Sequence, residues 1–233
     1  MTDTYICIDL ETTGLNPKTD KIIEIGAVKV IGGVVKDTFS AFVNPGRLLE
    51  ERVSELTGIT NAQLENAPYI EDIVPALEIF LEDFPLLGHR ILFDYSFLKK
   101  AMVTNKRSFE RQGIDTLRIA RRFLPQLEHR TLEYLCHHYN IPHTAHRAPE
   151  DAKATNKLYE ILVNDFYNEE EPCFKLQPLI YQVKKETPIT KPQKERLYRL
   201  LEKHGIVPDY DVEKLTRSEA SRHTDKILAM YGR

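Results

Sequence analysis

Three segments near the start decide the fold: Tyr5–Asp9 (YICID), Ile22–Ile31 (IIEIGAVKVI) and Val34–Val43 (VVKDTFSAFV). Their β-branched and aromatic residues favour the pleated surface of a strand. Only Gly32-Gly33 separates the second segment from the third, and two glycines are a typical hairpin turn. The pattern therefore predicts that the chain begins with a three-stranded antiparallel meander.

Helical patterns dominate the residues that follow. Apolar side chains recur at helical spacing from Ile70 to Leu81, which predicts an amphipathic helix. Further helices are expected at 93–102, 116–123, 131–139 and 148–166, with short strands at 86–88 and 114–115. Strands first, then strands alternating with helices, predict an α/β fold with one mixed sheet covered by helices.

The pattern breaks after Phe166. Residues 168–172 (NEEEP) are acidic and end in proline, which is typical of a linker. Two capping boxes further along each predict the start of a helix: Thr190 with Gln193, and Thr216 with Glu219. We therefore expect a first domain at 1–167, a linker at 168–187 and a small all-α module at 188–233.

The composition is that of a globular protein, with 42% hydrophobic and 29% charged residues among 233. It excludes a disordered or collagen-like chain, and the three cysteines lack paired zinc-ligand spacing. No apolar run reaches the roughly 18 residues that span a bilayer, and the start of the chain lacks the pattern of a secretory signal. We expect a cytoplasmic protein with no membrane partner.

Charge is distributed unevenly along the chain. The net charge is −3, but residues 184–233 hold 12 Lys and Arg against 8 Asp and Glu, and the remainder is acidic. A basic C-terminal region suggests an anionic partner, although a solvated helical face explains it equally well.

Two carboxylates lie at the end of the first predicted strand. Asp9 and Glu11 are two residues apart, so their side chains share one face of the strand. Neighbouring carboxylates repel each other and lose hydration when buried, and a divalent cation offsets both costs. The alternative is a pair of solvated edge residues, since exposed acids are common.

Two further acids begin predicted helices. Asp94 is aligned with the apolar stripe of the helix at 93–102, and Asp151 repeats this arrangement in the helix at 148–166. Each would also stabilise its helix as a cap. His146 precedes Asp151 by five residues, in the loop that enters the same helix, so it can stand near the same centre.

These residue types favour metal-assisted phosphodiester hydrolysis. Four carboxylates from three segments suit Mg²⁺ or Mn²⁺ rather than zinc, and a shared carboxylate can hold two such ions. A histidine with a pKa near neutrality can accept a proton from water. The sequence contains neither a Gly-x-Ser-x-Gly elbow nor a phosphate-binding glycine loop as a rival.

Three ordered motifs carry a family resemblance: Ile8–Gly14 (IDLETTG), Gly88–Leu98 (GHRILFDYSFL) and His146–Ala152 (HRAPEDA). Together they resemble the DEDD exonuclease superfamily, histidine subtype (DEDDh), which includes the proofreading epsilon subunit of bacterial DNA polymerase III. The resemblance covers residues 3–166. Familiar landmarks lie between the motifs: IEIGA at 23–27, VNP at 43–45, LTGIT at 56–60 and DTL at 115–117.

The resemblance implies a ribonuclease H-like fold and 3′→5′ release of nucleoside 5′-monophosphates from DNA. It implies that two Mg²⁺ or Mn²⁺ ions are held by four acids: Asp9, Glu11, Asp94 and Asp151. It implies that His146 is the general base. It also implies that the 3′-terminal nucleotide is lined by five residues: Thr12, Thr13, Gly14, Leu15 and Phe97.

One position departs from the family pattern. The second motif commonly reads Gly/Ala-His-Asn, whereas residue 90 is arginine here. Arg90 either points to solvent or touches a phosphate. The substitution leaves the acidic ligands intact and bears on the fit of the substrate.

The sequence leaves several alternatives open. The same chemistry on RNA, as in oligoribonuclease and RNase T, uses the same ligands as proofreading or repair of DNA. A non-catalytic nucleic-acid-binding or polymerase-docking protein would lack at least one acidic ligand, and none is missing. The expected partner is a single-stranded 3′ end. The C-terminal region is a candidate docking segment for a DNA polymerase, and Gln177–Tyr181 (QPLIY) loosely resembles a sliding-clamp-binding peptide.

Overall fold

The computed structural model describes residues 2–183 and 187–232. Among these residues the chain forms two compact units, one of residues 2–45 and 49–183, the other of residues 46–48 and 187–232. Residues 184–186 of the predicted linker, including the basic Lys184 and Lys185, lie outside the described residues.

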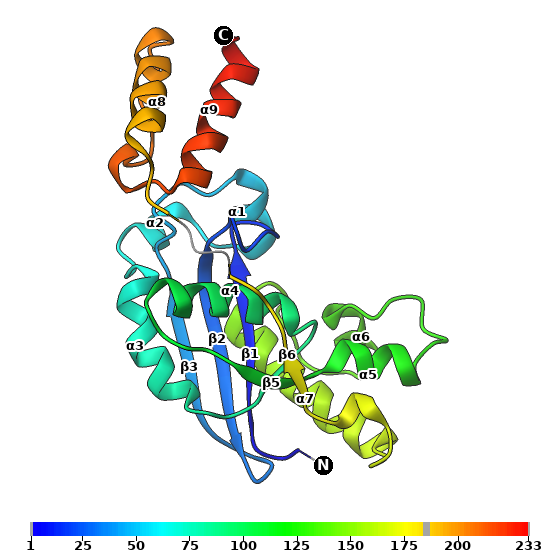
Figure 1. The fold of residues 1–233 in the computed structure, drawn as a ribbon. Coiled ribbons are helices and arrows are strands. Elements are labelled where there is room, and N and C mark those ends of the chain that lie inside the picture. The colour runs from blue at the N-terminus through cyan, green and yellow to red at the C-terminus, as the bar shows by residue number, and fades with distance from the viewer. Residues whose placement is uncertain (1, 184–186, 233) are drawn as a thin grey trace. The chain divides into compact units, whose positions relative to one another are not determined.

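A six-stranded mixed sheet forms the centre of the first unit, in the order β3-β2-β1-β4-β5-β6 (Figure 1). Its strands are β1 (Tyr5–Thr12), β2 (Ile22–Ile31), β3 (Val34–Phe42), β4 (Leu86–Gly88), β5 (Arg111–Asp115) and β6 (Gln177–Leu179). The first three strands form the predicted antiparallel meander, whereas β4 runs parallel to β1 and β5 parallel to β4. Both turn glycines, Gly32 and Gly33, have positive φ, which explains why glycine is needed there.

Helices cover both faces of this sheet (Figure 1). Those of the first unit are α1 (Glu51–Thr57), α2 (Asn61–Glu65), α3 (Ile70–Leu81), α4 (Leu92–Thr104), α5 (Thr116–Phe123), α6 (Leu132–His138) and α7 (Ala148–Phe166). Because side chains alternate along β1, Ile6 and Ile8 join the apolar cluster that includes α3 and α4. Tyr5 and Cys7 join the opposite cluster, with α5, α6 and α7. The predicted α/β fold with a helix-covered mixed sheet is confirmed.

The segment predicted as a linker contains an edge strand. β6 pairs with β5 in antiparallel fashion, and Leu179 is buried in the apolar cluster beside α3 and α4. A three-residue strand gives no periodic signal, and Pro178 is tolerated because it lies at the edge of the sheet. The peptide Gln177–Tyr181 is therefore built into the first unit and is not a free docking segment.

The second unit is a helical hairpin. It contains α8 (Lys191–Lys203), a short 3₁₀ turn (Val212–Lys214) and α9 (Arg217–Tyr231), and both predicted capping boxes are present. Leu197 and Leu201 from α8 pack with Ala220 and Ile227 from α9. Among the described residues, no helix is both long enough and apolar enough to cross a membrane.

Candidate metal centre

The first part of the site lies at the end of β1. Tyr5 and Cys7 face α7, and the Cys7 thiol donates a hydrogen bond to the carbonyl oxygen of Ala152, 3.1 Å away. Asp9 and Glu11 continue the same alternation, so their carboxylates face the first turn of α7. The sheet thus directs two acids toward the helix that carries a third.

The third acid is Asp151, in the first turn of α7. One carboxylate oxygen from each of Asp9, Glu11 and Asp151 can be chosen so that all lie within 4.8 Å of one another. Residues separated by about 140 positions in the sequence are therefore brought together. Three oxygen ligands at this spacing can contact one cation.

Asp94 lies beside this group, near the start of α4. Its side chain is buried, and its Oδ1 accepts a hydrogen bond from the backbone N–H of Leu10, 3.1 Å away. That bond fixes the Asp94 carboxylate against the strand segment between Asp9 and Glu11. The four predicted acids therefore occupy one region, although Asp94 is not among the three whose oxygens cluster most tightly.

Burial and mutual repulsion perturb the acids. Burial, followed by the charges of Asp94 and Asp151, raises the pKa of Asp9 well above its usual value. Burial, followed by the charges of Asp151 and Glu24, raises the pKa of Glu11 to about 8. Burial also raises the pKa of Asp94 and of Asp151. Without a cation the fold therefore holds several carboxyl groups where ionisation is unfavourable.

Two histidines lie near Asp151. Burial raises the pKa of Asp151, and against it the side-chain hydrogen bond and charge of His143, followed by the charge and backbone hydrogen bond of His146, lower it. His146, the predicted base, has a left-handed backbone with φ of 64°. The Nε2 of His143 forms a hydrogen bond with Asp151 Oδ1, and the His143 side chain is only 6% exposed. None of the three motifs includes His143, so the sequence pattern does not predict its contact with Asp151.

The predicted substrate residues divide into two groups. Thr13 is used within the fold, since its hydroxyl accepts a hydrogen bond from the N–H of Lys21, 3.0 Å away. Phe97 is buried against the ring of Phe93, and so it is not available to stack on a base. The Thr12 hydroxyl donates a hydrogen bond to the carbonyl oxygen of Gly14, 2.7 Å away. Leu15 follows this turn and is 79% exposed, which leaves it open to a ligand.

Two residues of the second motif that precede Asp94, His89 and Arg90, have structural roles. The Nδ1 of His89 contacts the Thr116 hydroxyl at 2.9 Å, and its Nε2 contacts the carbonyl oxygen of Arg130 at 2.8 Å. Arg90 is exposed, with its guanidinium over the ring of Phe93. Its φ of 72° is left-handed, a conformation that asparagine adopts more readily than arginine. The family's asparagine therefore has a backbone explanation, and arginine accepts some strain.

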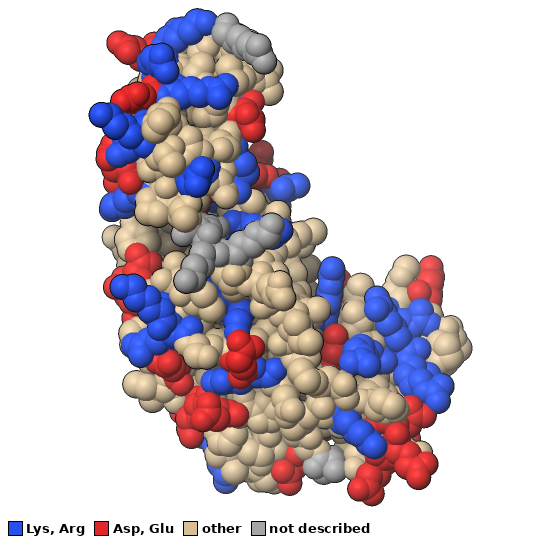
Figure 2. Space-filling view, viewed as in Figure 1, with Lys and Arg blue, Asp and Glu red and all other residues tan. Residues whose placement is uncertain are grey.

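Basic side chains gather near α5 and α6 in the first unit (Figure 2). Arg118, Arg121 and Arg122 all lie on α5, although Arg122 is paired with Glu171 at 2.7 Å. On α8 of the second unit, blue and red side chains are interspersed (Figure 2). The α5 cluster therefore supplies positive charge that can attract a polyanion.

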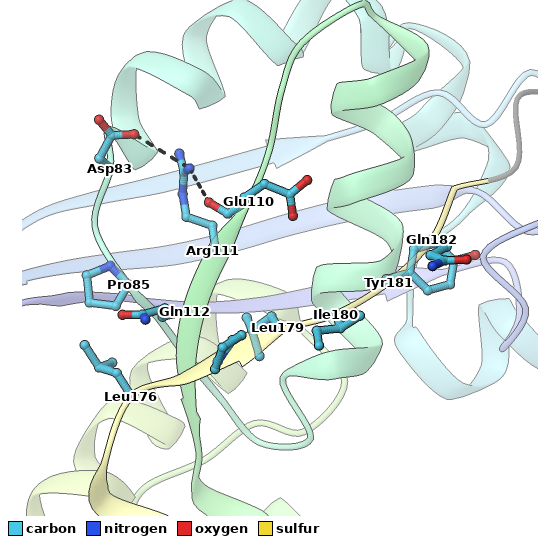
Figure 3. Close-up of a pocket in the computed structure, with 11 residues that line it drawn as sticks. Asp83, Pro85, Glu110, Arg111, Gln112, Leu176, Leu179, Ile180, Tyr181 and Gln182 are labelled. Atoms are coloured by element: carbon cyan, nitrogen blue, oxygen red, sulfur yellow. Dashed lines mark hydrogen bonds and ion pairs between the residues drawn. The ribbon is translucent and has the colours of Figure 1, made fainter.

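A separate pocket of about 560 Å³ lies along β5 and β6 (Figure 3). Arg111 is its central cation, and its guanidinium contacts Asp83 at 3.7 Å and donates to the carbonyl oxygen of Glu110 at 2.9 Å. None of the four clustered acids or the two histidines lines this pocket. The pocket therefore contains none of the residues proposed here for metal binding or proton transfer.

Comparisons with known proteins agree with this arrangement. The family model described as Exonuclease (RNase_T) matches residues 6–159. This range includes the three motifs and the four acids. The chain belongs to this exonuclease family.

Three relatives show how the resemblance is distributed. DNA polymerase III PolC-type of Thermotoga maritima is 40% identical over 67% of this chain, which spans 12% of that protein. The PolC-type protein of Oceanobacillus iheyensis is 33% identical over 97% of the chain and 17% of its own length. DNA polymerase III subunit epsilon of Aquifex aeolicus is 32% identical over 70% of the chain and 82% of its length. The chain thus spans less than a fifth of the PolC-type proteins and most of the epsilon subunit.

A solved structure gives the same result for the fold. Exonuclease X in complex with 5′ overhanging duplex DNA has a TM-score of 0.57 and 26% identity, covering 70% of this chain and 92% of its own. A structure of exonuclease I, with 20% identity and a TM-score of 0.61 over 70% of this chain, supports the fold alone. The ribonuclease H-like architecture expected from the motifs is thereby confirmed.

Proposed function

We propose that this chain is a metal-dependent 3′→5′ exonuclease that shortens DNA and releases nucleoside 5′-monophosphates. The observation that carries the proposal is the convergence of Asp9, Glu11 and Asp151 within 4.8 Å, beside the buried Asp94. DNA is supported as the substrate by the DNA in the exonuclease X complex and by the DNA polymerase III names of the relatives.

The donor set fits two Mg²⁺ or Mn²⁺ ions. All the donors are carboxylate oxygens, the ligands that hard cations prefer. Burial, followed by the charges of neighbouring acids, raises the pKa of Asp9 and of Glu11, and a bound cation would offset both effects. Asp9, Glu11, Asp94 and Asp151 would hold the ions. Such ions lower the pKa of a bound water and stabilise the leaving oxygen of a phosphodiester.

The chain's own residues account for the remaining steps. His146 would accept the proton of the attacking water, and its loop position brings it near Asp151 without fixing it on the helix. The backbone at Thr12 and Gly14 would contact the terminal sugar and phosphate, and the exposed Leu15 would pack on the terminal base. We assign Phe97 to the core instead of the substrate site.

The partner proposal is restricted to one part of the chain. The relatives named PolC-type and subunit epsilon support action beside a DNA polymerase, with the second unit as the candidate contact. The clamp-like peptide is not used in this proposal, because Leu179 is buried. We place the activity in the cytoplasm, where free cysteines such as Cys7 and Cys136 remain reduced.

The test uses single-stranded DNA labelled at one end or the other. With Mg²⁺, a 3′ label should leave at once as a 5′-mononucleotide, and a 5′ label should remain on progressively shorter strands. Asp9→Ala should abolish shortening, whereas Asp37→Asn, which changes an exposed acid on β3, should not. A matched RNA strand turned over faster than DNA would favour the RNA alternative. Binding without shortening under Mg²⁺ or Mn²⁺ would refute the nuclease proposal.

A further inference from the structure

A buried acid that belongs to none of the three motifs lies next to the candidate centre. Glu24 lies on β2, and its side chain is only 2% exposed. Arg147 donates to Glu24 Oε1 from Nη2 at 2.8 Å and from Nε at 3.2 Å. The backbone N–H of Ala148 donates to Glu24 Oε2 at 2.9 Å. Both carboxylate oxygens are therefore engaged by the two residues that follow His146.

The register of the sheet places this pair beside the acids. On the neighbouring strands, Glu24 lies opposite Glu11, and Gly26 lies opposite Asp9. Directly opposite residues on adjacent strands share a face of the sheet. The contact between β2 and the start of α7 is therefore one residue pair away from the carboxylate cluster.

Gly26 shows how closely the two segments approach. A Cβ at this position would lie 2.1 Å from the carbonyl carbon of Ala148 and 2.2 Å from the nitrogen of Pro149. These are backbone atoms, so they cannot move aside as a flexible side chain would. Because Gly26 has no side chain, the start of α7 can lie directly against β2. The hydrogen bonds of Glu24 to Arg147 and Ala148 hold the two segments together.

The segment held by Glu24 includes His146, the proposed base, and Asp151, the fourth proposed metal ligand. His146 has a left-handed φ of 64°, which costs energy for a residue with a side chain. Arg147 comes next, and its guanidinium also lies over the ring of Phe42, 5.5 Å from the centroid. When an arginine binds a buried carboxylate through two nitrogens, the main effect is to fix the orientation of both side chains. The net gain in folding stability is small, because both charges lose hydration.

We propose that Glu24 and Arg147 form a clamp that positions the His146–Asp151 segment against Asp9 and Glu11. Both are positioning residues: Glu24 holds Arg147 and the N-terminus of α7, and through them it sets where His146 and Asp151 stand. This inference rests on the proposed function for its catalytic consequence. Its structural part, the placement of Asp151 as a metal ligand, can be measured without turnover.

The experiment compares Mn²⁺ affinity and steady-state kinetics in the full chain. Glu24→Gln keeps an acceptor for the Ala148 N–H but removes the charge that holds Arg147. We expect its Kd for Mn²⁺, measured by titration without DNA, to rise at least tenfold, the range found for groups that orient metal ligands. On single-stranded DNA, kcat should fall by a similar factor with KM changed less than threefold, because Glu24 is too buried to touch DNA.

A matched control is available in the same unit. Glu171 binds Arg122 through Nε at 3.2 Å and Nη2 at 2.7 Å, a similar two-nitrogen contact that involves none of the site residues. Glu171→Gln should therefore leave both Mn²⁺ affinity and kcat unchanged. If Glu24→Gln behaves like Glu171→Gln in both measurements, the clamp is refuted.

Arg147 variants cover the case in which Glu24→Gln does not fold. The Arg147 side chain is 40% exposed, whereas that of Glu24 is 2% exposed, so replacing Arg147 should disturb the folding of the first unit less than replacing Glu24. Arg147→Lys, which retains the charge, should recover part of the Mn²⁺ affinity that Arg147→Gln loses. A rise in KM alone, with Mn²⁺ affinity intact, would show that Arg147 binds substrate and would overturn the clamp. If the unaltered protein binds Mn²⁺ but never shortens DNA, the proposed function fails while the Mn²⁺ titration still decides the clamp.

Discussion

The metal-free protein should lose stability as the pH rises, and Glu11 supplies a measurable part of that loss. Burial and neighbouring acids raise the pKa of Glu11 from 4.5 to about 8 in the folded chain. Between these values the folded protein keeps a proton that the unfolded chain has released. The folded state therefore binds more protons, and the free energy of unfolding falls as the pH increases.

The magnitude follows from the two pKa values. At about 1.4 kcal/mol for each pH unit, Glu11 alone lowers the free energy of unfolding by roughly 5 kcal/mol between pH 4.5 and 8. Its contribution is fully present below pH 4.5 and is lost as the pH rises through 8. Replacing Glu11 by Gln removes this titration and one source of the repulsion on Asp9, so the variant should be less sensitive to pH.

The assay is urea unfolding in EDTA from pH 5 to 8. Unfolding is monitored by the hydrogen exchange of backbone amides in β1 and β2, so that only the stability of the first unit is measured. Glu55→Gln, an exposed acid on α1, serves as the control and should keep the parent's dependence on pH. Adding Mg²⁺ at pH 8 should restore about 3 kcal/mol to the parent at a concentration one hundred times its Kd. A parent protein whose stability does not fall from pH 5 to 8, or a Glu11→Gln variant whose stability falls with pH as steeply as the parent's, would contradict a raised pKa of Glu11.

Three further substitutions test separate parts of the structure. Gly26→Ala should destabilise the first unit by about 3 kcal/mol or more, because its Cβ would overlap the α7 backbone, and an unchanged urea midpoint would contradict the close approach. His143→Gln should weaken Mn²⁺ binding about tenfold, since the imidazole orients Asp151, and an unaltered titration would remove His143 from the site. Arg90→Asn should raise the free energy of unfolding by up to about 1 kcal/mol, because asparagine better tolerates φ of 72°, and a lower stability would instead reveal a contact made by Arg90.

Local patterns predicted most of the fold because they coincide with the final contacts. The Gly32-Gly33 turn and the alternation in β1 depend on neighbouring residues alone, so the meander was visible in the sequence. The strand β6 was not predicted, because its three residues become a strand only by pairing with β5. The helix α2 was also missed, although Thr60 and Gln63 form a capping box that could have indicated it.

The residues of the candidate site could be predicted where they follow the residue spacing of a strand or a helix. Asp9 and Glu11 share a strand face, and Asp94 and Asp151 each begin a helix, so all four acids could be inferred. His143 reaches Asp151 only through the path of a loop, which no period describes. Glu24 was predictable from its neighbours: an acid between Ile23 and Ile25, at the apolar start of β2, requires a hydrogen-bonding or charged partner.

The burial of Phe97 has a similar explanation. A motif position indicates that a residue is near a site, but the side chain's exposure depends on how the helix packs. In α4 the Phe97 ring points into the apolar cluster, against Phe93. Residues expected to touch a substrate are therefore harder to predict than residues that hold a charge, since a buried charge allows few arrangements.

Asp9, Glu11, Asp94 and Asp151 are proposed to hold divalent cations together. Anomalous diffraction from a crystal grown with Mn²⁺ tests this proposal most directly. We expect two manganese peaks within bonding distance of these carboxylates, with His146 beside them and without a ligand bond to either ion. Peaks elsewhere, or the four carboxylates turned away from any bound manganese, would contradict it.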